Sequence, residues 1–231
     1  MLFLKILTIL NRLGLLLGAI AGGVIIFQHD VFAEGIPLPT PSHSSRISVE
    51  SALKQRRSLR EYPDEPVTLK EVSQLLWAAQ GITHEHGYRT APSAGALYPL
   101  EVYLVAGHVT DLPKGVYKYR PHTHTLVNIT EGDLRPELAV AAIGQNPVKT
   151  GSIVLIFAAV YERTTAKYGR RGLQYVHMEV GHAAQNVYLQ AVSLGLGTVF
   201  IGAFSDDRVR DVLDMPEKER PLGIMPVGRS R

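Results

Sequence analysis

The chain has 231 residues, no cysteine and a formal net charge of +3. This length suffices for one domain with a substantial core, and 45% hydrophobic with 19% charged residues is a globular composition. The lack of cysteine excludes disulfide scaffolds, thiolate zinc sites, iron–sulfur clusters and cysteine nucleophiles. The longest basic runs are the pairs Arg56-Arg57 and Arg170-Arg171, so we do not expect nucleic-acid binding.

Residues 1–33 differ in composition from the rest of the chain. Two basic residues precede an uninterrupted apolar run at Leu13–Phe27. A short polar stretch and then Val31-Phe32-Ala33 follow it, with the small residue Ala33 at the expected cleavage site. This order is typical of a secretory signal peptide that is cleaved after Ala33, and an uncleaved membrane anchor is the alternative. We therefore expect an exported protein, periplasmic or extracellular, or one that is tethered to a membrane.

Residues 34–46 are rich in proline and serine and are predicted to form a linker, which leaves 47–231 as the folded domain. Capping signals mark two helices near the start of this domain. Ser48 is a candidate N-cap for the first helix. Thr68 and Glu71 form a capping box before a second helix, which ends at Gly81.

Beyond residue 81 the chain mixes strand and helix patterns. Strands are predicted at residues 100–106, 115–119, 125–129, 153–160, 198–201 and 222–227. Helices are predicted at residues 133–143, 172–194 and 206–213. Because strands and helices do not alternate strictly, the predicted fold class is α+β.

Three segments are candidates for ligand binding. The run Arg56-Arg57-Ser58-Leu59-Arg60 holds three guanidinium groups that match phosphate geometry, although a solvated helix end would look similar. Residues 91–99 (APSAGALYP) surround a glycine with small side chains, which lets the backbone approach a flat ligand. Residues 195–204 (GLGTVFIGAF) lead two glycines into an apolar strand, and ordinary strand packing also explains this pattern.

Taken together and in this order, the three segments resemble the FMN-dependent nitroreductase superfamily, from about Val49 to Arg229. The pair Lys167-Tyr168, followed by RGLQYVHMEVGHAAQN at residues 171–186, resembles its SagB-type branch, which includes thiazoline and oxazoline dehydrogenases. The resemblance implies an α+β fold with a mainly antiparallel sheet flanked by helices. It also implies a homodimer with FMN at the subunit interface, and transfer of hydride or electrons through flavin N5.

The resemblance also implies which residues bind FMN. Those expected at the phosphate and the polar edge of the ring are Arg56, Arg57, Ser58 and Arg60, with Arg229 as a further phosphate contact. Those expected against the isoalloxazine ring are Pro92, Ser93, Ala94 and Gly95 from one side, and Phe200, Ile201, Gly202 and Ala203 from the other. One departure is Ala96, where many nitroreductases have an asparagine.

In the azoline dehydrogenases the resemblance makes Lys167 and Tyr168 the acid/base pair that deprotonates a small-molecule substrate. A lysine acts as a base only if burial lowers its pKa toward neutrality. The alternative is an exposed lysine beside a tyrosine that only packs. NAD(P)H is a candidate electron donor, but it is scarce outside the cytoplasm, and the sequence does not specify the substrate.

Two further functions compete with catalysis. The first is a flavin-binding module with the same fold and no turnover. The second is an exported metal-binding protein that uses the pairs His84/His86 and His122/His124, which have metal-ligand spacing if extended. No third or fourth ligand follows at a recognisable spacing, so no metal site is predicted.

Overall fold

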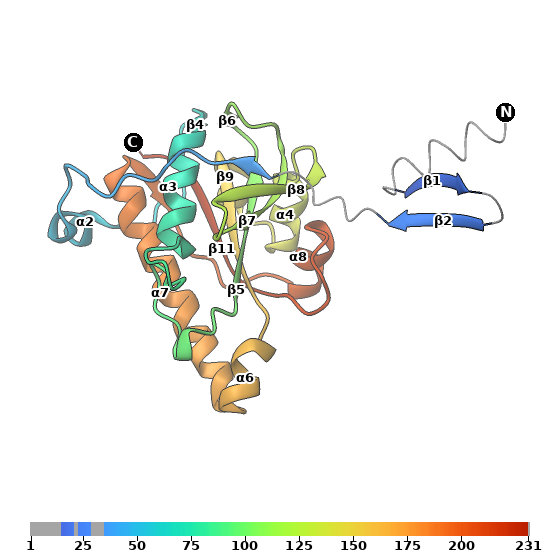
Figure 1. Ribbon diagram of the computed structural model, residues 1–231. Coiled ribbons are helices and arrows are strands. Elements are labelled where there is room, and N and C mark those ends of the chain that lie inside the picture. The colour runs from blue at the N-terminus through green and yellow to red at the C-terminus, as the bar shows by residue number, and fades with distance from the viewer. Residues whose placement is uncertain (1–14, 21–22, 29–34, 231) are drawn as a thin grey trace. The chain divides into compact units, whose positions relative to one another are not determined.

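The computed structural model describes residues 15–20, 23–28 and 35–230 (Figure 1). The chain divides into two compact units, Met1–Glu34 and Gly35–Arg231. In the first unit, β1 (Leu15–Ile20) pairs antiparallel with β2 (Gly23–Gln28). The expected signal peptide or anchor lies largely outside the described residues. Within those residues, no helix has the length and apolar character needed to span a membrane.

The second unit is built on an antiparallel sheet with the strand order β10-β11-β9-β5-β7-β8-β3. Its strands are β3 (Ile36–Pro37), β5 (Leu100–Ala106), β7 (Gly115–Arg120), β8 (Thr125–Glu131), β9 (Ile153–Ala159), β10 (Leu196–Thr198) and β11 (Arg220–Arg229). The short strands β4 (Val67–Thr68) and β6 (Val109–Thr110) pair in parallel beside it. This arrangement confirms the α+β class and the mainly antiparallel sheet.

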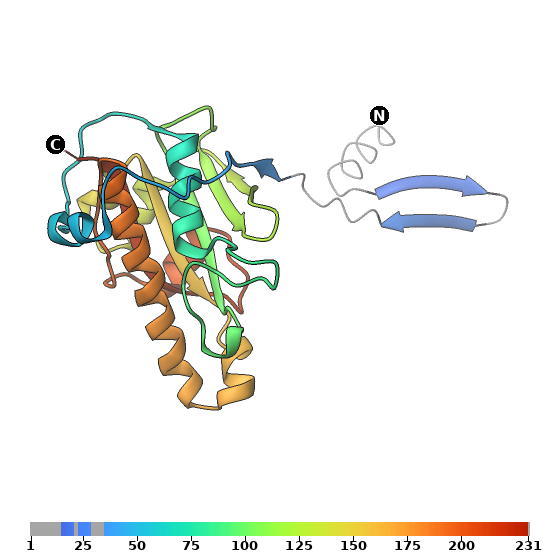
Figure 2. The same cartoon turned by 60° about the vertical axis from the view of Figure 1, so that its left-hand side comes forward.

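Helices cover both faces of the sheet, and the central strand β9 shows why. Its residues are all buried and alternate between two cores, with Leu155 and Phe157 in one and Val154 and Ile156 in the other. The first core includes the helices α3 (Leu69–Gln80) and α7 (Arg171–Ser193), which lie side by side in Figures 1 and 2. The second core includes α4 (Arg135–Ala141), α5 (Asn146–Thr150) and α8 (Asp206–Val212).

The helix starts that were predicted from capping signals are confirmed. The Ser48 side chain accepts a hydrogen bond from the Ser51 N–H at the start of α2 (Val49–Gln55). At α3, the Thr68 N–H donates to Glu71 Oε2 over 2.7 Å, and the Glu71 N–H donates to Thr68 Oγ1 over 3.2 Å. This capping box satisfies two backbone donors that the helix leaves unpaired at its N-terminus.

The segment predicted as a linker contributes to the sheet. Ile36 pairs with Leu126 of β8, the Leu38 N–H donates to the carbonyl of His124 over 3.1 Å, and Leu38 is buried. The compact unit therefore begins at Gly35 and not near residue 47. Pro37 is tolerated in β3 because this is an edge strand, where the backbone groups on the outer side have no neighbouring strand to pair with.

The long helix α7 contacts α6 (Glu162–Tyr168) near its N-terminus and also contacts α2 and β10. Close packing with α6 depends on Gly172, because a Cβ there would lie 3.0 Å from the Thr165 Cα. Figure 2 shows α6 folded against one end of the long α7. Groups that lie at different positions along α7 are therefore held at a fixed spacing.

Candidate active site

The arginine-rich segment lies beside β10, so two of the three predicted segments are neighbours. Ser58 forms a parallel bridge with Thr198, and the Leu59 N–H donates to the Thr198 carbonyl over 2.9 Å. Gly197 permits this approach, since a Cβ at that position would lie 2.8 Å from Leu59 Cδ1. Arg57 and Arg60 are exposed here, and Arg57 donates to the carbonyl of Lys54 over 3.0 Å.

Tyr188 of α7 joins these two segments and was not singled out by the sequence analysis. Its hydroxyl oxygen accepts a hydrogen bond from the Phe200 N–H over 2.7 Å and lies 3.2 Å from Ser58 Oγ. The Arg56 guanidinium carbon lies 5.1 Å from the centroid of its ring, which is cation–π geometry. Tyr188 therefore fixes the arginine-rich segment against the segment that follows β10. We call Arg56–Arg60, Tyr188 and Phe200–Ala203 the arginine half-site.

The segment at residues 200–203, which follows β10, presents an open surface close to the arginine-rich segment. Ile201 exchanges two backbone hydrogen bonds with Ile224, at 2.8 and 3.0 Å, and the Phe200 ring occupies the space where Gly223 lacks a side chain. Gly202 and Ala203 are exposed, and a Cβ on Gly202 would meet nothing within 4 Å. A planar ring fits on this segment, because backbone hydrogen bonds hold Ile201 and the next two residues have little or no side chain.

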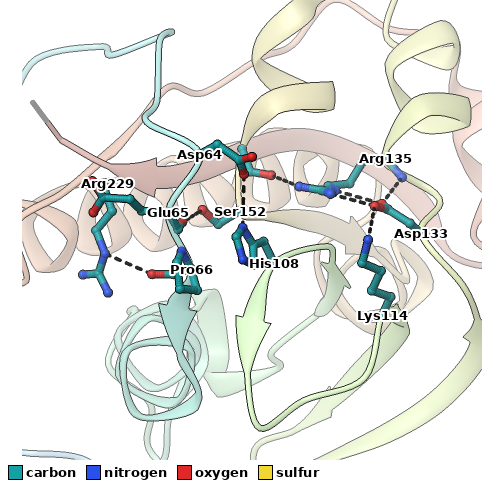
Figure 3. A network of polar contacts seen from close by, with 10 residues as sticks. Asp64, Glu65, Pro66, His108, Lys114, Asp133, Arg135, Ser152 and Arg229 are labelled. Carbon is teal, nitrogen blue, oxygen red and sulfur yellow. Dashed lines mark hydrogen bonds and ion pairs between the residues drawn. The ribbon is translucent and has the colours of Figure 1, made fainter.

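Arg229, predicted as a phosphate contact, is engaged by a carboxylate. Its terminal nitrogens donate to Glu71 Oε1 and Oε2 over 2.5 and 2.9 Å. Its Nε donates to the Pro66 carbonyl over 3.1 Å, as Figure 3 shows. Burial acts to raise the pKa of Glu71, but hydrogen bonds from Arg229 and Thr68 outweigh it and hold that pKa below its ordinary value. Arg229 thus ties the end of β11 to the start of α3, and its contact with phosphate stays a prediction.

Neighbouring polar contacts hold the loop between the arginine-rich segment and β4. Figure 3 shows Ser152 donating to the Glu65 carbonyl over 2.8 Å, and His108 Nδ1 lying 3.2 Å from Asp64 Oδ1. The same view contains the ion pair between Arg135 and Asp133, at 2.6 Å. The bonds at Asp64 and Glu65 fix the chain that leads from Arg60 to α3.

The remaining predicted segment, residues 91–99, lies beside Lys167 and Tyr168. A Cβ on Gly95 would lie 2.8 Å from the Tyr168 hydroxyl oxygen and 3.0 Å from Lys167 Nζ, and Gly95 adopts a φ of 64°. The Tyr168 ring meets the Tyr175 ring edge-on, with centroids 5.2 Å apart. Lys167 is exposed within this single chain. We call Pro92–Gly95 with Lys167 and Tyr168 the lysine half-site.

Ion pairs anchor α6, which carries Lys167 and Tyr168 of the lysine half-site. Arg163 donates to Glu101 Oε1 over 2.5 Å and to the Tyr98 carbonyl over 3.1 Å. Lys118 lies 3.2 Å from Glu101 Oε2 and 2.5 Å from Glu219 Oε1. Burial acts to raise the pKa of Glu101, but Lys118 and Arg163 lower it below its ordinary value. The position of α6 is therefore set by ion pairs that reach the central sheet.

The two half-sites lie at different places along α7. The lysine half-site meets α7 at Tyr175, and the arginine half-site meets it at Tyr188, thirteen residues further on. At a rise of 1.5 Å per residue, this spacing is about 20 Å along the helix axis. A ligand that contacts both half-sites of one copy would therefore have to span about 20 Å along α7.

The histidine pairs are engaged in other contacts. The rings of His84 and His86 lie 4.9 Å apart, and His84 lies against Tyr88. His124 Nε2 lies 2.7 Å from Ser73 Oγ, and its Nδ1 lies 2.9 Å from the Tyr119 hydroxyl oxygen. Over the described ranges, no group of three or more His, Cys, Asp or Glu side chains is placed to hold a metal ion.

Comparison with known proteins identifies the family. The model of the nitroreductase family matches residues 53–229. The chain belongs to the nitroreductase family. It is 55% identical over 183 residues to the protein MJ1384 of Methanocaldococcus jannaschii, which is named as a nitroreductase; the match covers 79% of this chain and 91% of MJ1384.

Two further nitroreductase-family relatives are informative. A Bacillus subtilis protein named FMN reductase [NAD(P)H] is 24% identical over 78% of this chain and 65% of its own length. A crystal structure of a Ralstonia eutropha protein described as a nitroreductase is 30% identical, with a TM-score of 0.73 over 85% of this chain and 89% of its own. The fold implied by the sequence resemblance is therefore confirmed.

Proposed function

We propose that this member of the nitroreductase family is an FMN-dependent oxidoreductase that works as a homodimer. The observation that carries the proposal is the grouping of the predicted residues into two half-sites. The arginine half-site offers cations and open backbone, and the lysine half-site offers a candidate proton acceptor. Because about 20 Å of α7 separates them within one chain, we infer that each complete site takes its half-sites from two copies.

The residues present fit FMN. Arg56, Arg57, Ser58 and Arg60 supply the guanidinium and hydroxyl donors that bind a phosphate, and Arg57 and Arg60 are exposed. Gly202 leaves the space within 4 Å of its Cβ position empty, which suits a planar ring. When bound, FMN supplies an acceptor or donor of hydride at N5. The name of the Bacillus subtilis relative supports FMN and makes NAD(P)H a candidate electron donor.

Lys167 and Tyr168 act on the substrate in this proposal. Lys167 Nζ takes the proton from the substrate carbon that is oxidised, and the Tyr168 hydroxyl holds the neighbouring heteroatom. Lys167 is exposed in the single chain, so the burial that a lysine base needs comes from the second copy and the substrate. The substrate class is a small molecule with an azoline-like ring, which follows from the SagB-type resemblance of this pair.

Export or membrane tethering is the second part of the proposal, and the order of residues 1–33 is its support. Fractionation of cells that express the full chain tests it. Recovery of the protein with the periplasm, the medium or the membrane is expected, and recovery only with the cytoplasm contradicts it.

The absorbance spectrum of the purified full-length protein, reconstituted with FMN and then treated anaerobically with NADPH, tests the flavin proposal. We expect the two visible bands of an oxidised bound flavin. Bleaching by NADPH indicates a reductase, and persistence of the bands directs the search to a substrate that the enzyme oxidises. A folded protein that stays colourless contradicts the proposal.

The variants Lys167→Ala and Tyr168→Phe separate an enzyme from a flavin-binding module. The enzyme loses turnover in both variants while it keeps its flavin bands. A module that only binds flavin has no turnover to lose, so wild-type protein and both variants behave alike.

A further inference from the structure

The loop that carries Gly95 has a strained backbone. Gly95, Ala96 and Tyr98 all have a positive φ, at 64°, 53° and 46°. Glycine adopts this left-handed region freely, but Ala96 and Tyr98 have side chains that disfavour it. Such strain persists only where surrounding contacts fix the backbone, and it is concentrated at functional sites. The contacts of Tyr98 therefore show what holds this loop in place.

Tyr98 is held through its backbone and its side chain. Its N–H donates to Ser93 Oγ over 2.9 Å, and its carbonyl accepts a hydrogen bond from Arg163 Nη1 over 3.1 Å. Its hydroxyl oxygen accepts the Arg89 N–H over 3.3 Å, and the Arg89 guanidinium carbon lies 4.5 Å from the centroid of its ring. These four contacts provide the external support that a left-handed tyrosine needs.

Two of these contacts tie the loop to helices. Arg89 also donates to Gln80 Oε1 at the end of α3, over 2.8 Å, and Arg163 belongs to α6. In Figures 1 and 2, the green loop that contains the short 3₁₀ turn η1 (Ala94–Ala96) lies beside α6. Of the four contacts to Tyr98, the one from Arg163 is the contact that reaches the helix of Lys167 and Tyr168.

Arg163 and Lys167 approach the loop from the same face of α6. They are four residues apart, so their side chains are neighbours on the helix surface. Arg163 meets the loop at Tyr98, and Lys167 meets it at Gly95, where a Cβ would lie 3.0 Å from Lys167 Nζ. Because α6 has seven residues and no side-chain cap at its N-terminus, it depends on such contacts for its position.

The guanidinium of Arg163 binds the loop and the central sheet at once. Its Nη1 donates to the Tyr98 carbonyl, and its Nη2 donates to Glu101 Oε1 of β5 over 2.5 Å. Glu101 is itself fixed, because its Oε2 lies 3.2 Å from Lys118 Nζ. A guanidinium is planar and rigid, so its two donors keep a constant angle. The carboxylate anchored in β5 therefore directs the other donor of Arg163 toward Tyr98.

We propose that Arg163 is the positioning residue of the lysine half-site, an inference that rests on the proposed function. Through the Tyr98 carbonyl it keeps the loop in its left-handed conformation, and this keeps Gly95 beside Lys167 and Tyr168. Without that hydrogen bond, the loop relaxes toward an unstrained backbone and the spacing at Gly95 is no longer fixed. The candidate proton acceptor then meets the substrate in productive geometry less often, which slows the chemical step.

The variant Arg163→Lys tests this inference in the protein without FMN. Lysine keeps the charge and can pair with Glu101, but one ammonium group does not reproduce the two-donor fork. The N–H groups of Ala96 and Tyr98 donate to Ser93 within the loop, so their hydrogen exchange reports its opening. We expect this exchange to become roughly tenfold faster, the factor expected from losing one hydrogen bond to a charged group. The melting temperature should stay close to that of the wild type.

Turnover in the presence of saturating FMN is the second readout. In Arg163→Lys we expect kcat to fall about tenfold, because misplacement of a reacting group slows the chemical step. KM should change little, because Arg163 belongs to neither half-site. The matched control is Arg210→Lys, since Arg210 pairs with Asp207 in α8, away from this loop. It should leave both the exchange and kcat as in the wild type.

Glu101→Gln separates the hydrogen bond to the loop from the ion pair. Its amide oxygen still accepts from Arg163, so the guanidinium stays directed at Tyr98 while the charge of the partner is lost. We expect a lower melting temperature and loop exchange close to that of the wild type. If the exchange accelerates as much as in Arg163→Lys, the ion pair alone holds the loop and the inference is overturned.

The outcomes distinguish the inference from the proposed function. If wild-type protein neither binds FMN nor shows turnover, the proposed function fails and the inference fails with it. If wild-type protein is active, and Arg163→Lys leaves either the loop exchange or kcat unchanged, only the inference is overturned. Faster loop exchange together with a lower kcat and an unchanged KM supports it.

Discussion

At the scale of single residues, Gly95 has both a left-handed backbone and crowded surroundings. Its φ of 64° favours glycine, and a Cβ would press on the Tyr168 hydroxyl and Lys167 Nζ. Gly95→Ala should lower stability by about 1–2 kcal/mol through backbone strain. It should also displace the lysine half-site and reduce FMN-dependent turnover at least several-fold, as steady-state kinetics would measure.

Gly144 supplies the control for this substitution. It has a φ of 73°, and a Cβ there would meet nothing within 4 Å. Gly144→Ala should therefore carry a similar strain, seen in urea unfolding, with unchanged turnover. Equal loss of turnover in the two variants would mean that Gly95 matters only through strain.

The pair between Glu71 and Arg229 gives a prediction about acid stability. Glu71→Gln removes the ion pair and should cost about 1.5–3 kcal/mol near pH 7, the range for hydrogen bonds to charged groups. Because the pKa of folded Glu71 is lowered, its contribution is present above the ordinary value of 4.5 and is lost as the pH falls through the folded value. The stability gap between wild type and Glu71→Gln should therefore narrow in acid.

Urea unfolding of both proteins between pH 3 and 7 measures this gap. Glu137→Gln, at an exposed position in α4, is the matched control. A gap that stays constant down to pH 3 would show that the charge of Glu71 contributes no stability.

At the scale of elements, the sequence predicts what local signals encode. The capping box of Thr68 and Glu71 predicts the start of α3, and the apolar run at β9 predicts a central strand; both are confirmed. The strand β3 has two residues and exists because Leu126 pairs with Ile36, so nothing within its own sequence distinguishes it from a linker. Similarly, α6 begins without a side-chain cap, and ion pairs through Arg163 hold it in place.

The candidate site also has parts that the sequence predicts and parts that only the folded chain reveals. Its three segments are recognisable from their residues, because arginine clusters and glycine-rich turns have a local chemistry. The contributions of Tyr188 arise only when α7 brings it beside Phe200 and Ser58. No spacing along the chain encodes these contacts, so sequence reasoning alone does not assign their roles.

The N-terminal strap, residues 35–42, gives a prediction at this scale. His124 Nε2 contacts both Ser73 and the Pro39 carbonyl, and burial lowers the pKa of His124 below its ordinary value of 6.5. A released strap leaves His124 free to take up a proton, so attachment of the strap should weaken as the pH drops below 6.5. Hydrogen exchange at the Leu38 amide should become faster in acid, after correction for the intrinsic rate.

His124→Gln removes the titrating group and should make this exchange independent of pH. The exposed His122 lies two residues away, so His122→Gln is the matched control and should retain the wild-type response. Acid-accelerated exchange that persists in His124→Gln would assign the effect to another group.

At the scale of the whole molecule, the separation of the half-sites along α7 predicts complementation between copies. Arg57→Ala damages the arginine half-site, and Lys167→Ala damages the lysine half-site. Each variant alone should have little turnover, because every site in its homodimer contains one damaged half. A mixed dimer should contain one site with both damaged halves and one site with neither.

Coexpression of the two variants with different affinity tags produces the mixed dimers. If subunits pair at random, half of the dimers are mixed and each holds one intact site in two, so turnover should recover to about a quarter of the wild-type value. Purified mixed dimers should reach about half. If purified mixed dimers are as inactive as the parent variants, both half-sites must act within one chain. The spacing of Tyr175 and Tyr188 along a rigid helix argues against that geometry, because a single flavin would then have to contact groups about 20 Å apart.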